Sequence, residues 1–287
     1  MKLVTYEMEN ATRIGALVDG GVVDLGAVAP DMLSLIERGE AGLAEARAAV
    51  EQGTPVAMDR VRLLAPIPRP RKNIVCLGMN YAAHAYESCR ARGLPEKLPE
   101  HPVFFTKSPT SVNRPDGEIP LDAELTQQLD WEVELGVVLG RTGKNISRDD
   151  ALAHVFGYTV INDISARDLQ NRHQQFFKGK SLDGSCPMGP CIVTADELPD
   201  AGDLALALRV NGETMQDSRT RDLVFDIPTI IEVLSRGQTV EAGDVISTGT
   251  PSGVGMGFDP QRWLQPGDVV EAEIERIGVL RNTVVAA

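Results

Sequence analysis

Two glutamates two positions apart, Glu132 and Glu134, are the residues whose types and spacing first indicate chemistry. They lead into the apolar, β-branched run 135–139, which predicts a strand buried on both faces. Alternate residues of a strand project from the same side, so both carboxylates face one way. Away from water the two would repel each other and favour protonation unless a cation compensates. The alternative interpretation is a polar row on the solvent side of an amphipathic strand.

A third carboxylate, Asp163, directly follows the predicted strand 158–162, with Arg167, Asp168 and Gln170 close behind it. Such crowding past a strand end is typical of a site, although Asp163 could instead cap the turn that follows. Carboxylates alone offer oxygen ligands, which select a hard cation such as Mg²⁺, Mn²⁺ or Ca²⁺. The chain has only four histidines, none paired at ligand spacing, which argues against a histidine-ligated metal oxygenase.

His84 and Glu87 stand one helical turn apart, where the glutamate can orient the histidine and raise its basicity. The glycine and prolines that follow in 93–99 are typical of a lid that changes order; a structural histidine is the alternative. Lys180 lies in the Gly/Ser/Pro-rich segment 177–190. It would bind a carboxylate or balance the acidic cluster, although a lone loop lysine is more often merely solvated.

The glycine-rich segment 248–255 follows a predicted strand but lacks the signatures of nucleotide-binding loops. We therefore expect it to expose backbone N–H groups to a small carboxylate.

The elements that must position these residues change in character along the chain. Residues 1–65 predict a small α/β domain, with strands at 2–5, 13–18 and 22–25 and helices at 32–37 and 43–51. Alternating prolines predict an extended linker at 66–71. Residues 72–287 are strand-rich, with strands expected at 73–77, 103–106, 132–139, 158–162, 204–210, 245–248 and 269–274. Two helices are predicted there, at 148–155 behind a Ser147/Asp150 capping box and at 227–235 behind Asp226. Few crossover helices favour a mixed, mostly antiparallel sheet curled into a roll.

Composition excludes several classes of function. Asp and Glu outnumber Lys and Arg by 41 to 28, a net charge of -13, which argues against nucleic acid as the main partner. No run approaches the roughly 20 apolar residues of a membrane helix. The start of the chain has no signal-peptide pattern, so a cytoplasmic protein is expected. The four cysteines form no C-x-x-C pair and are expected to be reduced.

Six ordered motifs between residues 70 and 284 together resemble the fumarylacetoacetate hydrolase family. They lie at 77–84, 105–109, 130–136, 157–170, 180–190 and 243–251. The resemblance implies an α+β, mainly β fold: a β-roll catalytic domain behind a small α/β N-terminal domain. It also implies a homodimer, a small 2-oxo acid as substrate, and Mg²⁺ or Mn²⁺ on Glu132, Glu134 and Asp163, with Ca²⁺ possible in a crystal. It places Lys180 and Gln170 near the substrate, Thr250 on its carboxylate, and His84 and Glu87 on a segment that closes over the site.

The reaction expected from this resemblance is hydrolytic C–C cleavage of a 2,4-dioxo acid, an acylpyruvate or diketo sugar acid, with release of pyruvate. His84 would activate water, and the metal with Lys180 would stabilise the enolate that leaves. Oxaloacetate decarboxylation and isomerisation of an unsaturated hydroxy diacid use the same enolate and are the alternatives. A non-catalytic metal-binding protein is the alternative from another class. The group beyond the cleaved bond would be selected by the lid or by an arginine, among Arg90, Arg92, Arg167 and Arg172.

Overall fold

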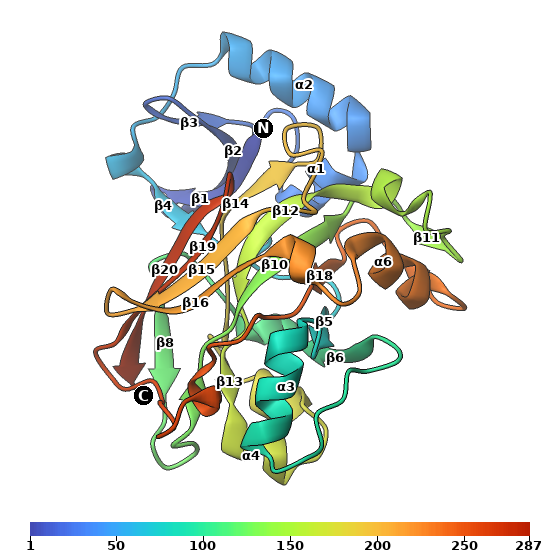
Figure 1. Cartoon of the computed structure of the whole chain (residues 1–287). Helices are drawn as coiled ribbons and strands as arrows, with labels where there is room; N and C mark the ends of the chain where they lie inside the picture. The colour runs from blue at the N-terminus through green and yellow to red at the C-terminus, as the bar shows by residue number, and fades with distance from the viewer.

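A mixed sheet of eleven strands forms the body of the molecule in the computed structural model, which describes residues 1–287 (Figure 1). Nine strands follow one another in the order β3 (Gly21–Asp24), β2 (Ala11–Val18), β1 (Lys2–Met8), β14 (Cys186–Thr194), β12 (Val155–Asn162), β10 (Val133–Leu139), β18 (Val245–Ser247), β5 (Ile74–Gly78) and β6 (Val103–Lys107). The other two, β4 (Arg62–Leu64) and β7 (Val112–Asn113), pair with β1 and β14. Most neighbours are antiparallel, while β18 with β5 and β14 with β7 are parallel.

A second sheet of five strands packs against the first. Its order is β16 (Glu213–Arg219), β15 (Ala205–Val210), β19 (Val269–Ile274), β20 (Gly278–Ala286) and β8 (Glu118–Leu121). The Asn211-Gly212 pair joins β15 to β16 with φ of 53° and 82°, the positive values that a tight hairpin needs. Two ribbons complete the strands: β9 (Leu129–Asp130) with β13 (Ser165–Ala166), and β11 (Gly143–Lys144) with β17 (Thr239–Val240). The predicted class, α+β and mainly β, is confirmed.

The two sheets bury the larger apolar core between them. β10 and β12 pack on β19, and β10 also meets β15. β15 and β19 alternate buried and half-buried residues, whereas every residue of β10 and β12 is buried. A strand covered on both faces reads as a nearly continuous apolar run, which explains why β10 was predictable from its sequence.

Residues 1–65 continue the large sheet, because β1 pairs with β14 through Lys2 with Val193 and Leu3 with Ile192. Beneath α1 (Met32–Glu37) and α2 (Gly39–Gln52), residues such as Leu35 share a second apolar core with Phe156 of β12. Division of the chain into domains 1–65 and 72–287 across a linker stays a prediction, which separate expression of the two pieces would test.

The helix predicted at 148–155 is wrong. The Ser147 hydroxyl does donate to the Asp150 carboxylate at 2.7 Å, but only a 3₁₀ turn, Ala151–His154, follows. β12 begins at Val155 because its residues are needed in the buried sheet, so tertiary packing overrides the local helix signal. Other 3₁₀ turns lie at Met58–Arg60, Pro109–Ser111, Thr220–Asp222 and Gly255–Gly257.

The predicted helix at 227–235 is present as α6 (Ile227–Ser235), and Asp226 accepts the Thr229 N–H at its start. α3 (Ala82–Ala91) contains the helical turn expected to hold His84 and Glu87, although its full extent was not predicted. Two further helices, α4 (Arg167–Arg172) and α5 (Phe177–Lys180), were not predicted. Figure 1 shows α3 and α4 at the end of the molecule opposite α2. No helix is both long and apolar enough to cross a membrane.

Candidate metal centre and active site

The carboxylates of Glu132, Glu134 and Asp163 meet at one point, with ligand oxygens all within 4.8 Å of one another. Glu132 and Glu134 stand at the start of β10, and Asp163 follows the antiparallel neighbour β12. Val133 pairs with Asn162 across these strands, and the Asp163 N–H donates to the Glu132 carbonyl at 2.8 Å. All three residues are buried, at most 3% exposed. A solvent-facing polar row is therefore wrong for the two glutamates.

Three buried cations surround two of these carboxylates. Lys180 Nζ lies 2.7 Å from both Glu132 Oε2 and Asp163 Oδ2. Arg167 Nη2 lies 2.6 Å from Glu132 Oε1, and Lys107 Nζ lies 2.7 Å from Asp163 Oδ1. Burial opposes ionisation of Glu132, but the charges of Lys180 and Arg167 outweigh it and hold its pKa below the usual value. The lysine at 180 is thus buried and paired, and the alternative of a solvated loop lysine is wrong. The carboxylate of Asp163 binds these lysines and caps no helix.

Glu134 is the carboxylate whose charge is not balanced. Its Oε2 accepts from the Ser247 hydroxyl at 2.6 Å and the Gly249 N–H at 2.9 Å, and its Oε1 has no hydrogen bond. Burial, followed by the charges of Asp163 and Glu132, raises its pKa well above the usual value. Three clustered carboxylates, one with an uncompensated charge and a free oxygen, match the donor set and the field of a hard dication. The residues present therefore fit a divalent metal.

Backbone N–H groups of the glycine-rich loop donate to carboxylates of the protein itself. They are those of Gly249 to Glu134 at 2.9 Å, Gly253 to Glu87 at 3.0 Å, Gly255 to Asp130 at 2.6 Å and Met256 to Asp130 at 3.2 Å. These donors are not free for a substrate carboxylate. The expectation that the loop offers its backbone N–H groups to a small carboxylate is therefore wrong for these four. The loop instead orients the acidic side chains of the site.

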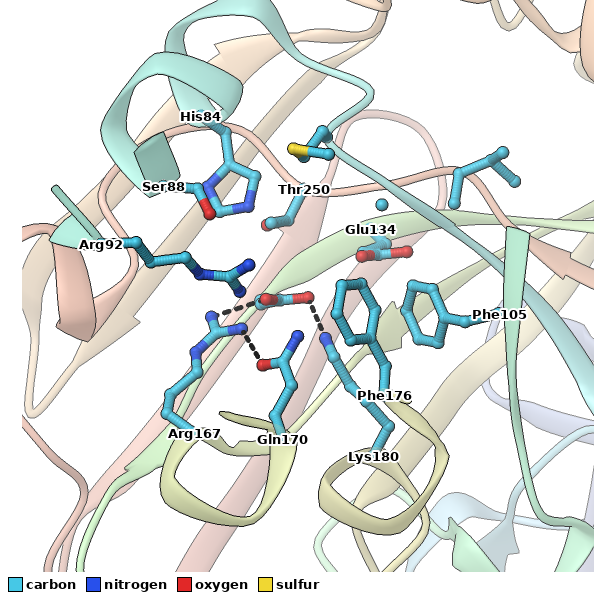
Figure 2. Close-up of a pocket in the computed structure, with 14 residues that line it drawn as sticks. His84, Ser88, Arg92, Phe105, Glu134, Arg167, Gln170, Phe176, Lys180 and Thr250 are labelled. Atoms are coloured by element: carbon cyan, nitrogen blue, oxygen red, sulfur yellow. Dashed lines mark hydrogen bonds and ion pairs between the residues drawn. The ribbon is translucent and has the colours of Figure 1, made fainter. Parts of the chain in front are cut away.

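The base candidate His84 lies on α3, only 7% exposed. Its Nδ1 is 3.1 Å from Glu87 Oε2, and the other Glu87 oxygen accepts the Gly253 N–H. Figure 2 shows the imidazole directed into the pocket. When Nδ1 carries the proton donated to Glu87, Nε2 is left unprotonated on the pocket side.

One pocket joins the histidine to the acidic cluster (Figure 2). Its polar side chains belong to His84, Ser88, Arg92, Glu132, Glu134, Arg167, Gln170, Lys180 and Thr250. Its apolar side chains belong to Leu77, Met79, Phe105 and Phe176. Asp163 lies behind this lining, fully buried. The structure thus places in one pocket His84, Lys180 and the three residues predicted to bind substrate.

The predicted substrate-binding residues already have partners in the protein. Gln170 Oε1 accepts from Arg167 Nη1 at 3.1 Å, which leaves the Gln170 amide nitrogen free to donate. The Thr250 hydroxyl donates to the Val133 carbonyl at 3.0 Å and accepts from Gln216 at 2.8 Å. Roles for Gln170, Thr250 and Arg167 in substrate binding stay predictions.

Sequence reasoning missed three residues that hold the site together. Asp130 accepts from Arg167 Nε at 2.8 Å, and Lys107 pairs with Asp163. Gln216 accepts the Val133 N–H at 3.0 Å and donates to Thr250, so it ties β10 to the glycine-rich loop. Asp130 could have been found, because it extends the two-residue spacing of the glutamates by one step.

Comparison with known proteins agrees with this geometry. Residues 73–285 match the family model "Fumarylacetoacetate (FAA) hydrolase C-terminal". Oxaloacetate tautomerase YisK of Bacillus subtilis is 42% identical over 99% of this chain and 100% of its own length. The fumarylacetoacetate hydrolase of Exiguobacterium antarcticum has a solved structure with a TM-score of 0.88, 44% identity and full coverage of both chains. The maleylpyruvate hydrolase of Sphingobium sp. SYK-6, solved with manganese(II) and pyruvate, gives a TM-score of 0.83 at 28% identity, again over both whole chains.

The buried acidic cluster, the histidine facing it and the fold around them thus occur in a chain that matches this family model over most of its length. The chain is an enzyme that belongs to the fumarylacetoacetate hydrolase family.

Proposed function

We propose that this enzyme interconverts the keto and enol forms of oxaloacetate, with Mg²⁺ or Mn²⁺ held by Glu132, Glu134 and Asp163. The observation that carries the proposal is one pocket with an oriented histidine facing the acidic cluster. That arrangement suits moving a proton at a carbon beside a carbonyl. The whole-length similarity to a protein named oxaloacetate tautomerase supports the choice of substrate.

A divalent cation bound by the three carboxylates would act as a Lewis acid that acidifies the C–H bonds beside a 2-oxo group. Glu132 and Glu134 line the pocket and would hold this cation at its wall. Asp163 would supply the third ligand, and Lys107 and Lys180 hold its two carboxylate oxygens in place.

In this scheme His84 moves the proton. Nδ1–H donates a hydrogen bond to Glu87, which leaves Nε2 unprotonated as the base, so the ring needs no rearrangement before it reacts. Nε2 takes a proton from C3 of the 2-oxo acid, and the electron pair of the C–H bond moves to the 2-oxo oxygen. The proton held on Nε2 then passes to that oxygen, which completes the enol and restores the neutral imidazole; the reverse order of steps returns the keto form. No water is consumed and no carbon–carbon bond breaks.

Lys180 and Arg167 stabilise the negative charge that develops on the 2-oxo oxygen. Burial lowers the pKa of Lys180, but Asp163 and Glu132 outweigh that effect and raise it overall, so the side chain stays an ammonium. Both cations are buried and held by carboxylates, so they keep their orientation during the reaction. Gln170 directs its free amide nitrogen to the same pocket.

The test follows the enol absorbance of oxaloacetate after the enol form is added to the protein with Mg²⁺, with pyruvate and CO₂ measured in parallel. We expect the enol to disappear faster than in the protein-free control without matching pyruvate. Pyruvate and CO₂ that form in step with the loss of enol would identify decarboxylation instead.

Hydrolysis of an acylpyruvate remains the second candidate function, because the same histidine can activate water in the same pocket. The neighbour solved with manganese(II) and pyruvate is named a maleylpyruvate hydrolase, and its fold is similar over the whole chain. Release of pyruvate and a carboxylic acid from acylpyruvates, with no acceleration of oxaloacetate enolisation, would favour this function over the tautomerase.

A further inference from the structure

Arg92 is a cation in the pocket without a carboxylate partner. It is the C-cap residue of α3, and its guanidinium forms no ion pair or hydrogen bond. Figure 2 shows it pointing into the pocket, toward Arg167. Partial burial of the guanidinium, followed by the charge of Arg167, lowers the pKa of Arg92.

The other cations of the site are already engaged. Arg167 binds Asp130 through Nε and Glu132 through Nη2. Lys180 bridges Glu132 and Asp163, and Lys107 lies behind the pocket on Asp163. Each of these three cations therefore already pairs with a carboxylate of the protein. Only Arg92 has all of its guanidinium donors free for a ligand.

An aromatic ring lies beside the guanidinium of Arg92. The Arg92 guanidinium carbon stands 5.9 Å from the centre of the Phe176 ring, within reach of a cation–π contact. His84 lies on α3 and Arg92 caps the end of the same helix, so a movement of α3 would carry the base and this arginine together. The residue is solvent-accessible, which places it at the mouth of the pocket rather than on its floor.

Charge pairing indicates what Arg92 accepts. Lys107, Arg167 and Lys180 already pair with carboxylates of the protein, whereas Arg92 pairs with none. If the carboxylate beside the 2-oxo group lies with the reacting end at the acidic cluster, Arg92 is still unpaired. A second carboxylate on the substrate would neutralise it.

We propose that Arg92 binds the distal carboxylate of the substrate and so makes the enzyme selective for short 2-oxo dicarboxylates over 2-oxo monocarboxylates. This inference rests on the proposed function for the identity of the reacting end. The planar guanidinium matches a carboxylate with two parallel hydrogen bonds, which a lysine does not reproduce. Arg92 is thus a specificity residue on the helix that also carries the base.

The test compares two pairs of molecules that differ only in the distal carboxylate. Malate and 2-hydroxybutanoate are unreactive analogues, and their affinities for the Mg²⁺-loaded protein are measured by calorimetry. Oxaloacetate and 2-oxobutanoate are the reactive pair, followed by exchange of the C3 protons in D₂O. The variants are Arg92→Ala and Arg92→Lys. The matched control is Arg90→Ala, because Arg90 lies on the same helix but pairs with Glu96 outside the pocket.

We expect the preference of the wild-type protein for malate over 2-hydroxybutanoate to fall about tenfold or more in Arg92→Ala, the usual effect of losing a charge-assisted hydrogen bond. The malate preference should fall less in Arg92→Lys than in Arg92→Ala, and Arg90→Ala should keep the wild-type preference. An unchanged preference in Arg92→Ala, or an equal loss for both analogues, would overturn the inference.

If the wild type does not enolise oxaloacetate but Arg92→Ala still loses its malate preference, the proposed function fails and this inference stands. If enolisation is seen and the preference is unchanged, only the inference fails.

Discussion

Lys107 Nζ lies 2.7 Å from Asp163 Oδ1, and neither side chain exposes any surface to solvent. The ammonium also donates to the Ile164 carbonyl at 3.0 Å. Burying a lysine costs folding free energy unless an opposite charge pairs with it, and here Asp163 supplies that charge. The pair also ties the last residue of β6 to the acidic cluster. Lys107 thereby supplies part of the positive charge that pairs with the Asp163 carboxylate.

Replacing Lys107 by Met keeps the length of the side chain and removes its charge. We expect the free energy of unfolding of the metal-free protein to fall by about 3–5 kcal/mol, because Asp163 loses one of its counter-charges. Saturating Mg²⁺ should recover part of this loss, since the dication replaces the missing positive charge. Denaturant unfolding with and without Mg²⁺ measures both values. Lys72→Met, at an exposed ion pair, should cost less than about 1 kcal/mol. A loss for Lys107→Met that Mg²⁺ leaves unchanged would contradict the electrostatic role.

Replacing His84 by Gln should lower the rate of oxaloacetate enolisation by about 100-fold or more, the usual contribution of a general base. The affinity for Mn²⁺ should stay at the wild-type value, because the three carboxylates are untouched. Enolisation kinetics and Mn²⁺ titration are measured on the same preparation. His173→Gln serves as the control, since His173 is exposed and lines no part of the pocket. A variant that keeps wild-type turnover would remove His84 from the mechanism.

Stabilisation of the protein by Mg²⁺ should grow as pH rises. Burial and the neighbouring carboxylates raise the pKa of Glu134 in the folded, metal-free protein above its ordinary value of 4.5. A raised carboxyl pKa costs stability above that ordinary value, where the unfolded chain has released its proton and the folded chain has not. Mg²⁺ competes with the same proton, so its effect on the melting temperature should increase as pH rises above 4.5. Thermal unfolding at a series of pH values, with and without Mg²⁺, measures this effect. A Mg²⁺ effect that is constant with pH would contradict this coupling.

Asp226 should contribute stability that acid removes. The hydrogen bond from Arg148, which outweighs the opposing effect of burial, lowers the pKa of Asp226 from 3.8 to about 2. A lowered carboxyl pKa adds stability above the ordinary value and loses it as pH falls through the folded value. Asp226 also caps α6, so Asp226→Ala should cost about 1 kcal/mol near neutral pH. The difference in unfolding free energy between the variant and the wild type should narrow as pH falls from 3.8 to about 2. Acid unfolding curves of the two proteins test this, and a gap of constant size would be the contrary result.

Local pattern was sufficient for the acidic cluster but not for what surrounds it. Glu132 and Glu134 were predictable because their spacing and the apolar residues after them define one face of a buried strand. Lys107 and Gln216 were missed because their partners lie far away in the chain, Asp163 for the lysine and Val133 for the glutamine. No local rule records such pairings.

The missed helices have a different cause. α4 and α5 have 6 and 4 residues, too short to be stable alone, and they form because packing places Arg167 and Lys180 against the carboxylates. The glycine-rich loop was read as a ligand-binding segment. Its glycines do direct backbone N–H groups at carboxylates, but these carboxylates belong to Glu134, Glu87 and Asp130. Composition alone did not show that the recipient carboxylates belong to the protein.

The most direct test of the account measures how fast the enol form of oxaloacetate disappears as Mn²⁺ is titrated into metal-free protein, with Glu134→Gln alongside. The account predicts that the rate rises with Mn²⁺ and saturates at one ion per chain, and that Glu134→Gln neither binds the ion tightly nor shows the rise. Wild-type enolisation that continues at full rate after the metal has been chelated would contradict the claim that the carboxylates of Glu132, Glu134 and Asp163 hold the ion on which the reaction depends.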